Sequence, residues 1–106
     1  MKRLASLLLI LSLLATPAEA APVVFVVRHA EKATGEGKDP ELSSAGHKRA
    51  DALARILKDS QIAAIFVTEF KRTQETAAPT AKGIHIIPTI VPSTDIAGLA
   101  ARLRAW

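Results

Sequence analysis

A continuous apolar segment rich in β-branched residues, Pro22–Val27, places the strongest constraint on the fold of this chain. The segment lacks the polar alternation of a strand with one solvated face, so it predicts a strand buried on both faces, as in a parallel sheet. Parallel strands need crossover connections, which are usually helices. The rest of the sequence should therefore alternate helices with further short strands.

The first helical pattern follows a loop predicted at residues 33–40, which contain two glycines and Asp39-Pro40. Ser43 is the expected N-cap, and the helix should end near residues 59–60. Its apolar face has helical spacing and comprises Ala50, Leu53, Ala54 and Leu57.

The remaining pattern is strand, helix, strand, helix. We expect a second strand at 63–67 and then a helix capped by Thr68, which should end near Gly83 and be kinked or stopped by Pro79. A weaker strand at 84–87 and a helix capped by Ser93 or Thr94 complete the order. This alternation predicts an α/β fold with a parallel sheet between layers of helices, a three-layer sandwich.

Basic side chains follow two of the predicted strands. Arg28 and His29 come directly after the first strand, and Arg72 lies about one turn into the helix after the second. Because the carboxyl ends of parallel strands share one edge, these side chains should converge there. Guanidinium groups match phosphate oxygens, free N–H groups at the helix start can add to an anion site, and a neutral imidazole beside them is a good nucleophile toward phosphorus.

Each of these residues also has a simpler interpretation. A histidine after a strand is more often a hydrogen-bonded structural residue, and Arg72 alone would more often be a surface charge paired with Glu69 or Glu75. His29 and Glu31 could face one metal ion, but they have no third ligand, so neither a metal nor another cofactor is expected.

Three segments, taken in order, resemble the motifs of the histidine phosphatase, or phosphoglycerate mutase-like, superfamily. Residues 25–32 are similar to its Arg-His-Gly-type motif, residues 39–46 to the start of its first helix, and residues 68–77 to the segment with its second phosphate-binding arginine. The resemblance implies the phosphoglycerate mutase-like fold, with His29 as the phosphorylated nucleophile and Arg28 and Arg72 as phosphate ligands. It implies a phosphatase that hydrolyses a phosphomonoester or a phosphohistidine.

The family also uses a second histidine after a later strand and an acid/base carboxylate. His47 and His85 lack the small-residue context of that second histidine, and neither Glu31 nor Glu69 can be assigned as the carboxylate. We therefore expect only the N-terminal part of the domain in this chain. An inactive phosphate-binding module or a truncated remnant is the alternative function.

Residues 1–20 have the order of a secretory signal peptide: a basic start, an apolar run at 4–14 and the small-x-small site Ala18-Glu19-Ala20. The run is too short for a membrane span. We expect cleavage to leave a domain at 21–106 that is periplasmic or secreted and not bound to a membrane.

Composition limits the ligands of the domain. The leader holds two of the 14 basic and one of the 10 acidic residues, so the remaining chain keeps a net charge of +3, which suits anionic ligands. The family resemblance implies that this ligand is a phosphorylated small molecule or a phosphoprotein. Four aromatic residues and no dense basic run exclude a nucleic-acid surface. The absence of cysteine excludes disulfides and thiolate metal sites.

Overall fold

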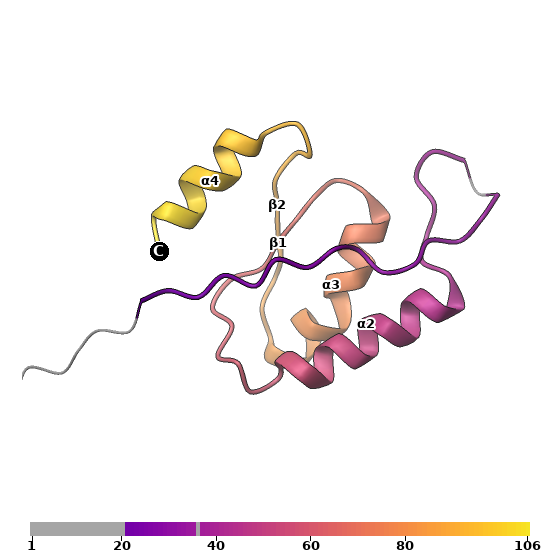
Figure 1. Cartoon of the computed structure of the whole chain (residues 1–106), viewed down its shortest axis with the longest axis horizontal. Coiled ribbons are helices and arrows are strands. Elements are labelled where there is room, and N and C mark those ends of the chain that lie inside the picture. Colours follow the sequence, from indigo (N-terminus) through magenta and orange to yellow (C-terminus); the bar gives the residue numbers. More distant parts are fainter. Residues whose placement is uncertain (1–20, 36) are drawn as a thin grey trace, which may run out of the picture.

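The computed structural model describes residues 21–35 and 37–106. The described part contains helices α2 (Ser44–Leu57), α3 (Lys71–Ile84) and α4 (Ile96–Arg104) and the short strands β1 (Phe66–Val67) and β2 (Thr89–Ile90) (Figure 1). Within it, no helix is both long and apolar enough to cross a membrane. The predicted signal peptide lies outside the described residues.

Helix α2 follows the sequence prediction closely. The Ser43 hydroxyl accepts a hydrogen bond from the Gly46 N–H at 3.0 Å, which makes Ser43 the N-cap as expected. Ala50 is fully buried and Leu53 half-buried, whereas Ile56 is exposed. The apolar face of α2 packs against α3, and the two helices lie side by side in Figure 1.

The sheet is parallel, as predicted. Phe66 pairs with Thr89 and Val67 with Ile90, and the backbone N–H of Val91 donates to the Val67 carbonyl at 2.8 Å. Helix α3 connects the two strands, so β1, α3 and β2 form one βαβ unit. The α/β class is therefore confirmed.

Helix α3 begins later than the sequence predicted and ends one residue beyond Gly83. It continues through Pro79 to Ile84 because buried residues on both sides of the proline, Thr76 and Thr80, hold it in place. The left-handed residue that ends it is His85, with φ of 59°, and not Gly83. The strand expected at 84–87 was therefore wrong, and the pairing falls at Thr89–Ile90.

Helix α4 also begins later than expected. Its N-cap is Asp95, whose Oδ1 accepts a hydrogen bond from the Gly98 N–H at 2.9 Å, in place of Ser93 or Thr94. Figure 1 shows α4 standing apart from α2.

The prediction of a buried strand at residues 22–27 was wrong. These residues form no strand, and Val23 and Val26 are 76% and 93% exposed. Among the described residues, no backbone hydrogen bond joins this segment to another one. A strand buried on both faces needs neighbouring strands and covering helices, and the pattern of its own side chains cannot supply them.

Candidate active site

His29 stands at the end of the extended N-terminal segment and is half-buried. Its Nδ1 lies 2.8 Å from the carbonyl oxygen of Ala30. A carbonyl can only accept a hydrogen bond, so in the neutral form of the ring this contact places the proton on Nδ1 and leaves the lone pair on Nε2. Nε2 has no hydrogen-bond partner in the part of the chain described here, so in that neutral form it would be available as a nucleophile.

Arg72 is the second residue of α3 and is half-buried. Its guanidinium carbon lies 4.2 Å from the centre of the Phe70 ring, a cation–π contact that restricts the side chain. No salt bridge joins Arg72 or Arg28 to a carboxylate within the described ranges. Both guanidinium groups therefore have donors to offer to an anion.

The hydroxyl of Thr76 connects the histidine segment to the arginine helix. It accepts a hydrogen bond from the Ala30 N–H at 2.9 Å and donates one to the Arg72 carbonyl at 2.6 Å. The end of the first segment is thereby held against the first turns of α3. No contact between the side chains of His29, Arg28 and Arg72 themselves is seen.

Arg28 is exposed and lines a cavity that neither His29 nor Arg72 lines. This open cavity of about 320 Å³ lies between the N-terminal segment, α2 and α3, and its other lining residues include Ala30, Arg49, Leu53 and Thr76. The hydrogen bond from the Ala30 N–H to Thr76 places the segment that carries His29 beside α3. The roles of Arg28, His29 and Arg72 in phosphate chemistry stay predictions.

The carboxylates near this edge already have partners. Glu31 Oε1 lies 2.6 Å from an Arg49 guanidinium nitrogen, and Glu75 Oε1 lies 3.5 Å from His47 Nε2 and accepts a hydrogen bond from the Leu42 N–H at 3.3 Å. Both carboxylates are thus held by neighbouring groups in this arrangement. The described residues contain no group of three or more side chains placed to hold a metal ion.

The start of α3 is capped from a distant loop. Thr68, the cap predicted from sequence, instead bonds Thr73, with 2.9 Å between their hydroxyls. Asp39 Oδ1 accepts the Lys71 N–H at 2.9 Å. The carboxylate of Asp39 therefore takes up one of the N–H groups that we had expected to be free for an anion.

Glu69 joins the loop before α3 to the loop before α4. Its carboxylate accepts hydrogen bonds from the Ser93 N–H at 2.8 Å and the Ser93 hydroxyl at 2.7 Å. The pKa of Glu69 lies below its ordinary value, first because the Ser93 hydroxyl donates to it, then because backbone N–H groups do, with Arg72 adding a favourable charge. An ionised, hydrogen-bonded Glu69 accepts protons poorly and has none to donate.

We expect Glu69→Gln to change how stability depends on pH. Because the pKa of Glu69 is lowered in the folded state, the ionised carboxylate stabilises the fold at pH values above its ordinary pKa of 4.5. This stabilisation is lost as the pH falls through the lower pKa of the folded state. The wild type should therefore unfold at a higher temperature than Glu69→Gln at pH 7, and the difference should shrink near pH 3. Thermal melts at both pH values test this. Equal differences at the two pH values, or the same trend in a control Asp51→Asn variant of an exposed carboxylate, would contradict it.

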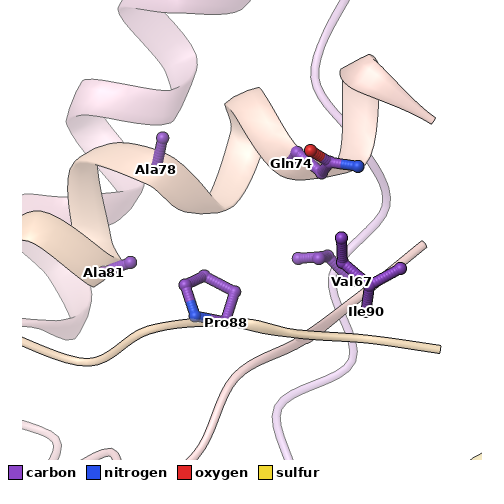
Figure 2. A pocket seen from close by; sticks show the side chains of 6 residues that line it. All are labelled: Val67, Gln74, Ala78, Ala81, Pro88 and Ile90. Atoms are coloured by element: carbon purple, nitrogen blue, oxygen red, sulfur yellow. The ribbon is translucent and has the colours of Figure 1, made fainter. Parts of the chain in front are cut away.

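A second cavity of about 320 Å³ lies between α3 and the sheet and is lined by Val67, Gln74, Ala78, Ala81, Pro88 and Ile90 (Figure 2). Gln74 is its one polar residue, and the Gln74 amide nitrogen donates to the Thr68 carbonyl at 3.0 Å. None of the six side chains that line this cavity can act as a nucleophile, an acid or a base.

His47 and His85, the other two histidines, are exposed on α2 and at the end of α3.

Solved structures share this fold. A mycobacterial glucosyl-3-phosphoglycerate phosphatase superposes with a TM-score of 0.53 and 23% identity, over 59% of this chain and 32% of that one. A second protein, mycobacterial hydrolase 1, gives a TM-score of 0.53 and 20% identity over 70% of this chain and 44% of that one. The chain thus spans less than half the length of these structures, and at such identities they show the fold alone.

The sequence itself carries the family assignment. No curated protein matches it significantly. The sequence profile of the histidine phosphatase superfamily, branch 1, matches residues 24–94, which include Arg28, His29 and Arg72 and cover well over half of the chain. This match confirms the resemblance, and the chain belongs to the histidine phosphatase superfamily.

Proposed function

We propose that this chain provides the nucleophile and the phosphate ligands of a phosphatase that cleaves a phosphomonoester or a phosphohistidine. The single observation that supports it most is the contact of His29 Nδ1 with the Ala30 carbonyl oxygen at 2.8 Å, which leaves Nε2 without a partner in the described residues. Membership of the superfamily and the unpaired guanidinium groups of Arg28 and Arg72 agree with this role.

The proposed reaction has two displacements at phosphorus. In the first, the Nε2 lone pair forms a bond to phosphorus while the bond from phosphorus to the leaving group breaks, and the leaving group takes up a proton. In the second, water attacks the phosphohistidine, the N–P bond breaks and inorganic phosphate is released. Arg28 and Arg72 would neutralise charge on the phosphoryl oxygens in both steps, where most of the catalysis of phosphoryl transfer lies.

Phosphate binding without turnover is the second candidate. It is favoured by the carboxylates Glu31 and Glu69, which are both held by other groups, so that no general acid is evident among the described residues. This candidate predicts saturable binding of inorganic phosphate with no release of phosphate from a donor. In either case the predicted leader suggests that the protein acts outside the cytoplasm.

Trapping the phosphoenzyme tests the proposal. The full chain is incubated with radiolabelled acetyl phosphate or phosphoramidate and quenched in alkali, where phosphohistidine survives. We expect label on the wild type, none on His29→Ala, and unchanged label on His85→Asn, a control in which asparagine tolerates the left-handed backbone at that position. A wild type without label, or equal label on His29→Ala, would contradict the proposal.

A further inference from the structure

The side chain of Thr76 is the polar link between the two parts of the proposed site. Thr76 is 7% exposed and lies on the face of α3 that meets residue 30. Its hydroxyl has a single proton, which it donates to the Arg72 carbonyl at 2.6 Å. A lone pair is then left to accept the Ala30 N–H at 2.9 Å, so both hydrogen bonds have a defined direction.

The segment before His29 has little else to hold it. Among the described residues, 22–28 form no backbone hydrogen bond with any other segment. On the other side of His29, the Glu31 carbonyl accepts hydrogen bonds from the N–H and the hydroxyl of Ser43, at 2.8 and 3.1 Å. These bonds fix the segment to the start of α2. Among the hydrogen bonds of the described residues, the one through Thr76 alone joins residues 22–31 to α3, the helix that carries Arg72.

We propose that Thr76 is a positioning residue, whose hydroxyl sets the location of His29 relative to Arg72. This inference rests on the function proposed above. Thr76 touches neither the nucleophile nor the guanidinium group, and it acts through the backbone of the residue after His29 and of Arg72 itself. Rates of group transfer fall steeply when reacting groups are misplaced by as little as about 1 Å, so the loss of this hydroxyl slows phosphorylation of His29.

The chain contains a matched control one helical turn away. Thr80 is 4% exposed, and its hydroxyl oxygen has no hydrogen-bond partner among the described residues. Replacing a threonine by valine keeps the shape of the side chain and removes only the hydroxyl. Thr76→Val therefore deletes two hydrogen bonds, whereas Thr80→Val deletes none. Thr76→Ser restores the hydroxyl and omits the methyl group.

Hydrogen exchange tests the link independently of any activity. In the full chain, the amide of Ala30 should exchange about tenfold faster in Thr76→Val than in the wild type, the factor expected for one ordinary hydrogen bond. Thr76→Ser and Thr80→Val should keep the wild-type rate. If Thr76→Val leaves the rate unchanged, or if Thr80→Val raises it equally, Thr76 does not position this segment.

The kinetics of labelling test the consequence for the site. With acetyl phosphate as the donor, the rate at saturation should fall at least about tenfold in Thr76→Val. The donor concentration at half-saturation should change much less, because the guanidinium groups remain, and Thr76→Ser should recover most of the rate. A loss in Thr76→Val that serine does not rescue, or an equal loss in Thr80→Val, would overturn the inference. If the wild type itself takes no label, the proposed function fails, and the exchange rates still decide whether Thr76 holds Ala30.

Discussion

Replacing Arg72 by alanine should lower the rate of His29 phosphorylation by at least about 100-fold, the usual loss when a donor to the developing charge is removed. Arg72 has no carboxylate partner in the described part of the chain, and its guanidinium group is held against the Phe70 ring at 4.2 Å. A side chain that is already ordered loses little entropy when it binds a phosphoryl group. Its removal would leave charge on two phosphoryl oxygens without a planar pair of donors.

Two further variants separate geometry from charge. Arg72→Lys keeps the positive charge but presents no fork of donors and stacks less well on an aromatic ring, so we expect it to recover only part of the rate. Lys71→Ala removes the same charge from the neighbouring, exposed residue and keeps the Lys71 N–H that Asp39 accepts. It should label as fast as the wild type. Equal losses in Arg72→Ala and Lys71→Ala would mean that only the net charge of the region matters.

Measuring the label on His29 in these variants also separates the two candidate functions. If Arg72→Ala weakens the binding of inorganic phosphate while the wild type takes no label, the site binds phosphate without forming a phosphohistidine. If label forms on His29 and is lost only slowly in water, the first displacement takes place. The second displacement, the attack of water on the phosphohistidine, would then need a further catalytic group.

The elements that sequence predicted correctly are those with a local signal. The N-cap Ser43 and the apolar face around Ala50 follow from spacing over a few residues. The parallel sheet follows from the alternation of strands and helices, although its second strand lies at Thr89–Ile90 and not at 84–87. The segment at 22–27 has an equally strong local pattern but is exposed, because burial depends on what lies beside it. At the end of α3, glycine is the residue that most readily adopts the left-handed conformation, but the helix continues past Gly83. His85 adopts that conformation instead.

The residues of the candidate site also fall into two groups, those with a local sequence signal and those whose partners are distant in sequence. Arg28, His29 and Arg72 were proposed as site residues because each follows a predicted strand, and strand ends carry function in parallel sheets. Thr76, Asp39 and Glu69 were missed as connecting residues because each bonds a partner far away in sequence. The separations are 46 residues for Thr76 and Ala30, 32 for Asp39 and Lys71, and 24 for Glu69 and Ser93. No pattern within a single helix or loop indicates such contacts.

Gly46 should be the position in α2 that is least tolerant of change. It is buried in the first turn of α2, where an added Cβ would collide with the backbone carbonyl oxygen of Glu31 and lie 3.1 Å from Leu42 Cβ. A backbone group cannot rotate away as a side chain can, so the segment at 29–31 or the helix must move. The same carbonyl accepts both hydrogen bonds from Ser43, which would be strained together with it.

We therefore expect Gly46→Ala to lower the free energy of unfolding by about 3 kcal/mol, the range of severe overpacking. Gly83→Ala is the matched control, because Gly83 lies inside α3 with nothing within 4 Å of an added Cβ. That change should stabilise the protein by about 0.5–1 kcal/mol, since alanine is the better helix former. Urea denaturation of both variants measures the difference. If Gly46→Ala is as stable as Gly83→Ala, residue 46 does not pack against Glu31, and α2 cannot be what fixes the segment after His29.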